Sequence, residues 1–371
     1  MEMFAVSSIK LLMQEGHEVH LACIKNSPID IQSAKSGIQR FTFNSARPGL
    51  VNIIKLSQHM LYNSYQLIHT HYSKDLWIII PALKFLGYTT PVVMTKHLGS
   101  AISKKDFLHK MLYRRLDHVV AISEVIRKNI LDTTPVNETK VTLVHNYFDD
   151  KKFIKDDSTI LGLKKEFGLN DSTLVLGMIG RITPGKGHED VIEALRILRS
   201  DDLDVKVIVA GSAQKDEAGF EEYLKGLITK YSLEKYFVFT GFRNDVPALL
   251  SIFDIFLFPS HAEAFGLALI EAMAMGIPSI VCYSDGVKDI AVENETSLTF
   301  SRNDYASLAG KIEILMKDKQ LRKHLSEKSF ERSLLFTPDL FQKKIGRLYE
   351  KLLQEREHDC TDEIYNRGKI A

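Results

Sequence analysis

The sequence has few of the features that mark secreted, membrane-spanning or nucleic-acid-binding proteins. Its three cysteines are far apart and match no metal-binding spacing, so we expect reduced thiols and no zinc site. The best apolar stretch, 76–85, is too short to cross a membrane, and no signal peptide is recognisable. A net charge of +1 gives no electrostatic reason to expect nucleic acid. We therefore expect a cytoplasmic protein.

Short apolar segments that are typical of buried strands alternate with helical segments along the chain. In the first half the strands are expected at 18–24, 38–43, 67–71, 92–97, 118–123 and 141–146, and in the second at 174–179, 205–210, 237–240, 255–259, 279–282 and 298–300. Such alternation is typical of βαβ units. It predicts an α/β fold with a parallel, doubly wound sheet in each half.

A highly charged segment without hydrophobic periodicity, 148–157, separates the two halves. We therefore predict an N-terminal Rossmann-like domain over 1–150 and a C-terminal one over 151–337, facing each other across a cleft. A long amphipathic helix is expected at 340–353. The polar tail that follows, 355–371, is expected to fray.

The first predicted element is a helix at 3–14, whereas a doubly wound domain normally opens on a strand. We therefore expect the first sheet to lack a central strand, because the sequence begins late through truncation or a misplaced start. The two neighbouring strands would then lose hydrogen-bond partners. The first domain should be the less stable one.

The segment 259–278, PSHAEAFGLALIEAMAMGIP, is the most informative part of the chain. It follows a buried strand, places Glu263 before a glycine-containing turn, and continues into a helix that carries Glu271. Free backbone N–H groups and the positive dipole end of such a helix suit a diphosphate. Glu271 would lie about 6 Å further along the helix axis, so the two carboxylates can reach hydroxyls on opposite sides of the phosphates. A nucleoside diphosphate sugar has hydroxyls in both places.

The pattern E-A-F-G-L-A-L-I-E-A-M-A resembles the signature of the retaining, family-4 glycosyltransferases with the GT-B fold. The resemblance implies that Glu263 contacts the transferred sugar near the reaction centre and that Glu271 binds the ribose hydroxyls. The donor diphosphate would then lie against the helix start at Phe265, Gly266 and Leu267. The alternative is an ordinary amphipathic helix with two surface carboxylates.

A second glycine-rich segment, GRITPGKG at 180–187, lies between a predicted strand and a helix. Arg181 and Lys186 would supply two fixed cations for a leaving diphosphate. The segment nearly matches a P-loop, but Gly187 stands where a Ser or Thr would hold Mg²⁺. The resemblance matches Arg181 and Lys186 to the diphosphate-binding pair of the family.

Glycines at two further strand ends are candidates for contact with the nucleotide. The resemblance assigns Gly211, Phe242 and Arg243 to base binding, although strand-end glycines are common in any α/β protein. The sequence 202–204, Asp-Leu-Asp, resembles the metal motif of the other glycosyltransferase fold but sits in a predicted turn. We therefore expect no metal and no cofactor, with the nucleotide sugar as co-substrate.

Histidines gather at two strand ends of the first half. The resemblance implies that His97 faces the sugar and helps to orient or activate the acceptor, the alternative being a structural strand-end histidine. His69 and His71 alternate on a strand like paired zinc ligands, but no third ligand is evident. The basic segment 103–116 could lie as a helix on an anionic membrane, although a helix packed on the first domain is the simpler interpretation.

The resemblance covers nearly the whole chain and implies that helix 340–353 crosses back onto the first domain. The chain departs from the family at Asp285-Gly286 and Asp289, where Gly-Gly and Glu are usual, and at Asn146-Tyr147, where Asn-Gly is usual. We predict a retaining glycosyltransferase that moves a sugar from a nucleotide-diphosphate sugar to a glycan or glycolipid acceptor in polysaccharide or cell-envelope biosynthesis. The alternatives are a nucleotide-sugar epimerase of the same fold and a non-catalytic nucleotide-sugar binder.

Overall fold

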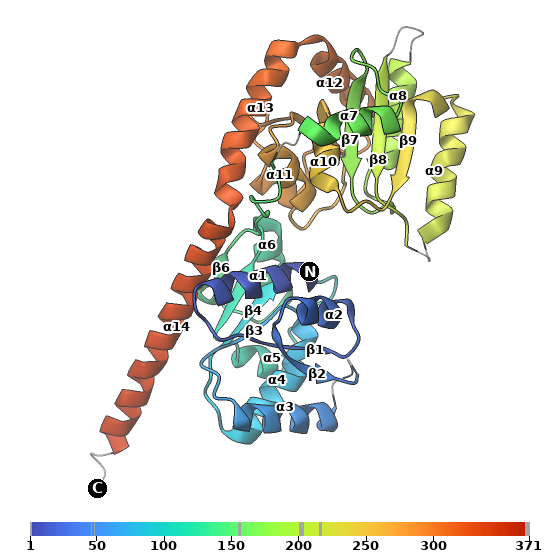
Figure 1. Cartoon of the computed structure of the whole chain (residues 1–371). Helices are drawn as coiled ribbons and strands as arrows, with labels where there is room; N and C mark the ends of the chain where they lie inside the picture. The colour runs from blue at the N-terminus through green and yellow to red at the C-terminus, as the bar shows by residue number, and fades with distance from the viewer. Residues whose placement is uncertain are drawn as a thin grey trace. The chain divides into compact units, whose positions relative to one another are not determined.

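The computed structural model describes residues 2–45, 47, 49–154, 157–199, 204–214 and 217–367. The chain forms two compact units, drawn in Figure 1: unit 1 is Met1–His145 with Asp339–Ala371, and unit 2 is Asn146–Pro338. Each unit is described by itself below. Both consist of parallel strands and helices, so the α/β, Rossmann-like fold class expected from the sequence is confirmed.

Unit 2 contains one parallel sheet of six strands in the order β12-β11-β10-β7-β8-β9. The strands are β7 (Leu174–Ile179), β8 (Val205–Ala210), β9 (Phe237–Gly241), β10 (Ile255–Phe258), β11 (Ser279–Cys282) and β12 (Ser297–Phe300). Each strand was expected from its short apolar run. The strand order reverses between β7 and β10, which pair directly. In sheets of this kind ligands bind beyond the carboxyl ends of the strands at such a reversal.

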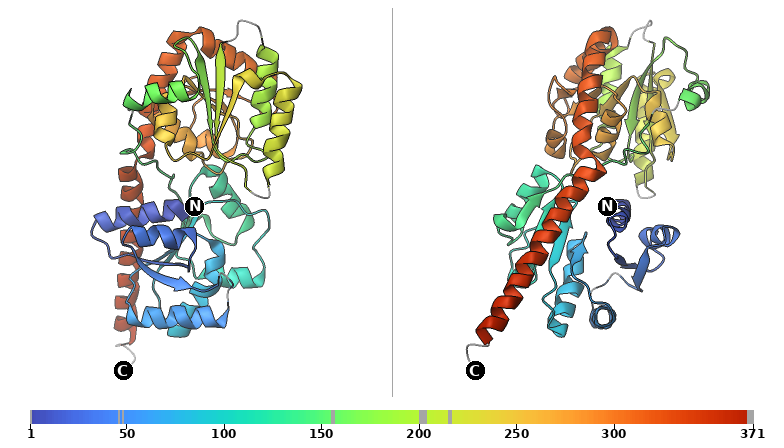
Figure 2. Two further views of the ribbon diagram at one scale, coloured as in Figure 1. Left: turned by 45° about the vertical axis from the view of Figure 1, so that its right-hand side comes forward. Right: turned by 60° about the vertical axis from the view of Figure 1, so that its left-hand side comes forward.

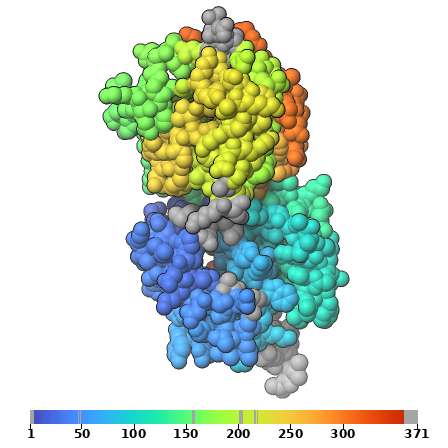
Figure 3. Space-filling model, turned by 90° about the vertical axis from the view of Figure 1, so that its right-hand side faces the viewer, coloured from blue at the N-terminus to red at the C-terminus, as the bar shows by residue number. Residues whose placement is uncertain are grey.

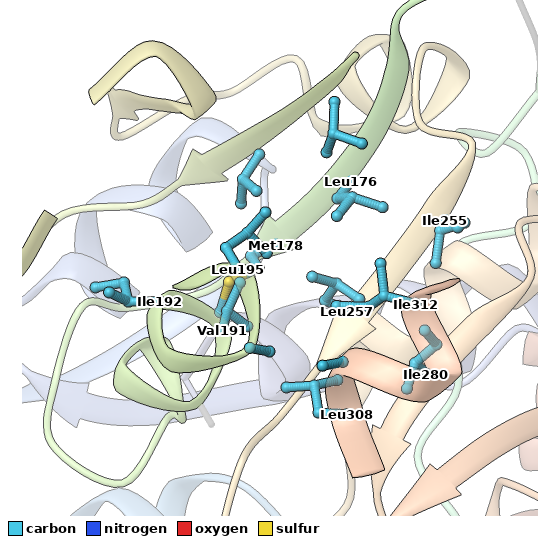
Figure 4. Close-up of a cluster of buried hydrophobic side chains, with 14 of the residues drawn as sticks. Leu176, Met178, Val191, Ile192, Leu195, Ile255, Leu257, Ile280, Leu308 and Ile312 are labelled. Carbon is cyan, nitrogen blue, oxygen red and sulfur yellow. The ribbon is translucent and has the colours of Figure 1, made fainter. Parts of the chain in front are cut away.

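Helices cover both faces of this sheet and bury its side chains. They are α7 (Asp157–Glu166), α8 (His188–Leu198), α9 (Ala218–Lys230), α10 (Val246–Ser251), α11 (Leu267–Ala274), α12 (Tyr305–Lys317) and α13 (Lys319–Ser333). Figure 4 shows Leu176 and Leu257 of adjacent strands beside Leu195 of α8 and Ile312 of α12, all at most 1% exposed. Continuous burial of this kind explains why the strands read as unbroken apolar runs.

Unit 1 contains two separate parallel sheets, β1-β2 and β3-β4-β5-β6. The strands are β1 (His20–Ile24), β2 (Gln39–Phe43), β3 (Ile68–Thr70), β4 (Val92–Lys96), β5 (His118–Ala121) and β6 (Val141–Leu143). The helices are α1 (Glu2–Gln14), α2 (Pro28–Lys35), α3 (Leu50–Tyr62), α4 (Leu76–Leu86), the 3-10 turn η1 (Ser73–Asp75), α5 (Phe107–Arg114), α6 (Glu124–Thr133) and α14 (Pro338–Arg367).

The strands of unit 1 are interrupted between β1 and β3, as the sequence led us to expect. Among the described strands, β1 pairs only with β2 and β3 only with β4. Ala22, in the middle of β1, is exposed, whereas every residue of β4, which is paired on both edges, is buried. Figure 2 shows β1 and β2 apart from the four-stranded sheet, and Figure 3 shows an opening between the dark blue and lighter blue surfaces.

The last helix, α14, packs on the four-stranded sheet of unit 1. Its Ile345, Leu348 and Leu352 form one buried cluster with Val93 of β4 and Val120 of β5. Figure 2 shows the helix running along this sheet. The helix continues to Arg367, so the expectation of a frayed tail from residue 355 is wrong for the described residues. The cluster ties the end of the chain to its first half.

Two helices of unit 1 differ from the sequence-based expectation. Helix α2 was not predicted because it is short and weakly amphipathic, although Ser27 at its N-cap and Pro28 at its first position are recognisable start signals. Helix α5 covers 107–114 rather than 103–116. The Asp106 carboxylate caps it by accepting hydrogen bonds from two backbone N–H groups, which fixes where the helix begins.

The open edges of β1 and β3 predict uneven protection of backbone amides in unit 1. Alternate amides of 20–24 and 68–70 point away from their only partner strand and should exchange with solvent within minutes near neutral pH. Amides of β4 and β7, which are paired on both edges, should be protected for orders of magnitude longer. Hydrogen exchange measured by NMR tests this. Uniform protection along β1 equal to that of β4 would show that its edge is covered.

Candidate functional site

Loops at the carboxyl ends of β7, β8 and β10 meet where the strand order of unit 2 reverses. Glycines allow their backbones to touch. A Cβ atom on Gly187 would lie 2.2 Å from the carbonyl oxygen of Pro259, and one on Gly211 would lie 1.8 Å from that of Gly180. No other residue fits either position without moving backbone. The glycine-rich segments noted in the sequence therefore hold three loops at fixed positions.

Lys186 and Glu263 form an ion pair at this meeting point. The Lys186 Nζ donates to the Glu263 Oε2 at 2.5 Å, and the Ser260 hydroxyl donates to the same oxygen at 3.3 Å. The two charged side chains are 30% and 19% exposed. The sequence suggested both residues for one ligand, but it did not predict that they contact each other. A diphosphate bound at Lys186 would share that cation with Glu263.

The segment that carries Glu263 is anchored from both sides. The backbone N–H of Gly286 donates to the Glu263 carbonyl at 2.9 Å, and a Cβ on Gly286 would lie 2.5 Å from the Ala264 carbonyl. Asp285, one of the departures from the family pattern, adopts a positive φ of 42°. Gly286, which this close approach requires, is therefore present as in the family pattern. The residue that differs from the pattern is its neighbour Asp285.

A histidine–carboxylate contact that the sequence did not reveal fixes the same segment to α8. The ring Nε2 of His261 lies 2.7 Å from the Asp190 Oδ2, and the Asp190 side chain is 2% exposed. The His261 backbone N–H also donates to the Gly185 carbonyl at 2.8 Å. The signal for this pair was weak, because a lone Asp in the first turn of a helix usually only complements the helix dipole.

Helix α11 presents its amino end to the site without a side-chain cap. Gly266 is its N-cap residue, with φ of 120°, and Leu267 is its first helical residue. The first backbone N–H groups of a helix have no intrahelical acceptor and therefore suit an anion. Phe265 is 2% exposed and packs edge-on against Phe336, so it can offer a ligand only its backbone.

Glu271 of α11 is half-buried, and burial raises its pKa to about 7, with Lys152 acting in the opposite direction. No hydrogen bond or ion pair of its carboxylate is found among the described residues. A carboxylate in that state can accept hydrogen bonds from ligand hydroxyls, which fits the ribose-binding role implied by the resemblance. That role stays a prediction.

The residues suggested for base and diphosphate contacts differ in whether their side chains are free to bind a ligand. Arg181 is exposed after β7, and the Phe242 side chain is 73% exposed after β9. The Arg243 guanidinium is engaged by Asp245, at 2.6 and 2.8 Å, and by Glu166 at 2.7 Å, contacts that raise its pKa further. Any base contact of Arg243 would therefore involve its backbone. Gly211 accounts for the loop packing described above.

His97 is buried in unit 1, in a cluster with the half-buried His69 and His71. Its Nε2 is 3.0 Å from the Nδ1 of His71, which stacks on His69 with ring centroids 4.7 Å apart. Burial, followed by the neighbouring charge of His71, lowers the pKa of His97 to about 3, and burial lowers that of His71 to about 4. These rings are neutral at physiological pH, so His97 can orient a ligand but is a weak base.

The described residues contain no group of three His, Cys, Asp or Glu side chains arranged to hold a metal ion. Of the Asp-Leu-Asp motif, residues 202 and 203 lie outside the described residues, and the Asp204 carboxylate accepts a hydrogen bond from Ser172 at 2.5 Å. Within the described ranges, no helix combines the length and the apolar character that a membrane span requires.

Sequence comparisons match both halves of the chain to related families. Residues 162–332 match "Glycosyl transferases group 1" and residues 1–152 match "Glycosyltransferase Family 4". N-acetyl-alpha-D-glucosaminyl L-malate synthase of Bacillus anthracis is 26% identical over 337 residues, 87% of this chain and 86% of the relative. UDP-Gal:alpha-D-GlcNAc-diphosphoundecaprenol alpha-1,3-galactosyltransferase of Escherichia coli is 25% identical over 307 residues, 78% of each chain.

Solved structures share the fold of the whole chain. A glycosyltransferase from Rickettsia africae has a TM-score of 0.87 at 21% identity, over 95% of this chain and 94% of that one. Anabaena Alr3699/HepE in complex with UDP and glucose has a TM-score of 0.80 at 21% identity, over 94% and 95%. At these identities the likeness establishes the fold.

The raised pKa of Glu271 predicts that this residue destabilises the folded protein at high pH. The folded-state pKa of about 7 lies above the usual 4.5, so the folded state holds the proton more tightly and stability falls as pH rises between those values. Glu271→Gln should therefore raise the free energy of unfolding at pH 8 by on the order of 1–3 kcal/mol and change it little at pH 4.

Scanning calorimetry at both pH values measures this effect, and Glu222→Gln is the matched control because Glu222 is exposed on α9. An equal gain at both pH values would contradict the assignment to ionisation, and an equal gain in the control would make it a general charge effect.

Proposed function

The chain belongs to the family-4 glycosyltransferases, and we propose that it moves a sugar from a nucleoside diphosphate sugar to a glycan or lipid-linked acceptor with retention at the anomeric carbon. The observation that carries the proposal is the contact of Lys186 with Glu263 at the strand-order reversal of unit 2. It brings a cation for the diphosphate and a carboxylate for the sugar within one hydrogen bond of each other.

The leaving diphosphate is held by charge and by backbone dipoles. Arg181 and Lys186 supply the cations, and the amino end of α11 at 265–267 supplies N–H donors. Negative charge grows on the phosphate oxygen as the bond to the sugar breaks, so these contacts strengthen in the transition state. Because the two cations can balance the leaving diphosphate, we propose that the reaction needs no metal ion, and we expect EDTA to leave the rate unchanged.

The sugar is held by Glu263, while the acceptor hydroxyl attacks the anomeric carbon from the face that the diphosphate leaves. The bond to the phosphate oxygen breaks, the bond to the acceptor oxygen forms, and the leaving phosphate oxygen takes the acceptor proton. No dedicated base is then required. A neutral His97 is suited to orient sugar or acceptor hydroxyls and not to carry the proton.

The nucleoside is held by the half-buried Glu271 at the ribose and by the loops after β8 and β9 at the base. The exposed ring of Phe242 and the backbone at Gly211 are the contacts available there. UDP is the first nucleotide to test, because Alr3699/HepE forms complexes with UDP and glucose and with UDP-glucose. The increase in melting temperature with each of a panel of nucleotides and nucleotide sugars would identify the base and the sugar that this chain prefers.

The acceptor carries an acidic group and belongs to polysaccharide or cell-envelope biosynthesis. The names of relatives include L-malate, diphosphoundecaprenol and D-inositol 3-phosphate, all of which are acidic, and a capsular polysaccharide glycosyltransferase of Staphylococcus aureus is 28% identical over 246 residues. We place the enzyme in the cytoplasm, at the inner face of the membrane.

Membrane contact would be made by the surface of α5. Phe107, Leu108 and Met111 are 78%, 50% and 48% exposed, on a helix that also carries exposed basic side chains. Apolar side chains of this kind insert at the headgroup level while basic ones meet anionic lipid.

The donor-site assignment predicts opposite effects for the two members of the ion pair. Lys186→Ala should weaken UDP binding by roughly 1.5–3 kcal/mol, about 10- to 150-fold, because one charge-assisted contact is lost. Glu263→Gln frees Lys186 from its carboxylate, so UDP should bind at least as tightly while sugar transfer falls at least tenfold. Calorimetry and a transfer assay measure the two quantities.

Lys225→Ala is the control, because Lys225 forms a similar ion pair with Glu221 on the far helix α9, at 2.7 Å. Unchanged UDP affinity in Lys186→Ala, or loss of UDP binding in Glu263→Gln, would contradict these roles. Conversion of the sugar without an acceptor would favour an epimerase, and binding without turnover of any donor would favour a non-catalytic binder.

The surface of α5 predicts reversible binding to vesicles. Wild-type protein should co-sediment with vesicles rich in anionic phospholipid and release in high salt, whereas Phe107→Asp with Met111→Asp should reduce the bound fraction several-fold. Phe85→Asp is the control, because Phe85 is 77% exposed on α4. A control that loses binding equally, or a double variant that binds like wild type, would contradict the contact.

A further inference from the structure

Three lysines converge at the carboxyl ends of β3 and β4 in unit 1 without a carboxylate to balance them. Lys96 is the last residue of β4, Lys74 lies in η1 directly after β3, and Lys104 follows β4 in the loop before α5. Among the described residues, none of the three forms a salt bridge. Like charges placed together repel, so an arrangement of this kind favours either the loss of a proton or the binding of an anion.

Lys96 is buried, with 7% of its surface exposed. Burial, followed by the charge of Lys104, lowers the pKa of Lys96 to about 8. Burial also lowers the pKa of Lys104, with the hydrogen-bonding contact to Lys96 acting in the opposite direction and the charge of Lys74 adding to the lowering. A lysine at the end of a buried strand could extend to solvent. The Lys96 amino group instead lies near that of Lys104. An anion bound between the two groups would stabilise this arrangement.

The loop that places Lys104 is fixed and not a free surface segment. The Lys104 backbone N–H donates to the Thr133 carbonyl at 2.6 Å, and Asn129 exchanges two hydrogen bonds with the Ser100 backbone, at 2.7 and 3.0 Å. Both anchor residues belong to α6. The Lys104 Nζ donates to the Ser73 hydroxyl at 2.9 Å and lies within hydrogen-bonding reach of the Lys96 amino group, which leaves at least one of its three N–H donors for a ligand.

A buried hydroxyl supplies an independent observation. Tyr113 of α5 is 4% exposed, and its hydroxyl has no hydrogen-bond partner within the described part of the chain. It lies near the Ser73 hydroxyl, which lowers the pKa of Tyr113 as a hydrogen-bonding neighbour, while burial, the larger effect, raises it to about 12. Buried hydroxyls normally make well-formed hydrogen bonds, and Ser73 already accepts one from Lys104, so the Tyr113 hydroxyl points to a further group that completes the site.

We propose that Lys74, Lys96 and Lys104, with the hydroxyls of Ser73 and Tyr113, bind a phosphate or diphosphate group of the acceptor. The proposal rests on the function proposed above only in naming the ligand as the acceptor. Ligands of parallel sheets bind beyond the carboxyl ends of the strands, which is where these residues meet. The cluster contains ammonium groups alone and no arginine fork, an arrangement that suits a multiply charged phosphate better than a planar carboxylate.

The place of the cluster also fits a phosphate that is attached to lipid. Phe107 and Leu108, which are largely exposed, begin α5 directly after the loop that carries Lys104. A phosphate held at the lysines would therefore have an apolar surface next to it. A soluble phosphorylated acceptor shares the same phosphate chemistry, and the experiment separates the two sources.

The test is calorimetry on the full chain with inorganic pyrophosphate, performed in saturating UDP so that the donor site is occupied. We expect wild-type protein to bind pyrophosphate and the variants Lys96→Met and Lys104→Met to bind it at least tenfold more weakly, with UDP affinity unchanged. Lys105→Met is the control, because Lys105 is the exposed neighbour of Lys104. Equal loss in the control, unchanged binding in both variants, or tighter binding of L-malate than of pyrophosphate would overturn the proposal.

A second measurement keeps the test decisive if a variant fails to fold. Wild-type protein in saturating UDP is treated with an amine-reactive label, with and without pyrophosphate, and labelled lysines are quantified by mass spectrometry. Pyrophosphate should protect Lys96 and Lys104 and leave Lys105 unaffected, and equal labelling of Lys96 and Lys104 in both conditions would overturn the assignment. Farnesyl diphosphate that protects at tenfold lower concentration identifies a lipid-linked ligand, and equal potency identifies a soluble one.

The experiment distinguishes failure of this inference from failure of the proposed function. If wild-type protein does not bind UDP, the donor site is wrong whatever pyrophosphate does at the lysines. If UDP binds and pyrophosphate does not, the donor site stands and the lysine site is wrong.

Discussion

The geometry of the candidate donor site depends on backbone-to-backbone contact between loops of unit 2. Gly187 against Pro259 and Gly211 against Gly180 are approaches that exclude any side chain. These contacts fix the positions of the loop with Lys186 and the loop with Glu263 at the end of the sheet. The two side chains, which are far apart in the sequence, can therefore form a hydrogen bond of 2.5 Å. The positions of the charged side chains therefore depend on Gly187 and Gly211, which have no functional side chain of their own.

Much of unit 2 could be predicted from the sequence because most of its strands are buried on both faces, with the edge strand β9 half-buried. Continuous apolar runs such as LVLGMI in β7 and IFLF in β10 have few competing interpretations. Unit 1 was harder. Helix α2 lacks a clear apolar stripe, and α5 begins at a cap that overrides the longer basic pattern. The position of α14 against β4 could not be derived from local patterns, since the residues that meet are far apart in the chain.

The residues of the candidate site could be proposed from the sequence, but their contacts with one another could not. Glu263, Lys186 and Glu271 stand out because each lies at a strand end or a helix start with glycine nearby. Sequence spacing cannot show that Lys186 contacts Glu263, that Asp190 holds His261, or that Arg243 is already engaged by two carboxylates. Those facts depend on which loops lie side by side. Lys96 and Lys104 escaped notice for the same reason, because isolated lysines usually only indicate a solvated surface.

The return of α14 to unit 1 has a consequence for how the chain acquires its structure. Val93 and Val120 are covered by Leu348 and its neighbours, which are synthesised after the whole of unit 2. At about 5–20 residues per second, that interval lasts roughly 10–40 s on the ribosome. In this interval unit 2 can complete its continuous sheet. The four-stranded sheet of unit 1 meanwhile has an uncovered apolar face, because α14 has not yet been synthesised. The part of the chain that is made first is therefore the part that finishes folding last.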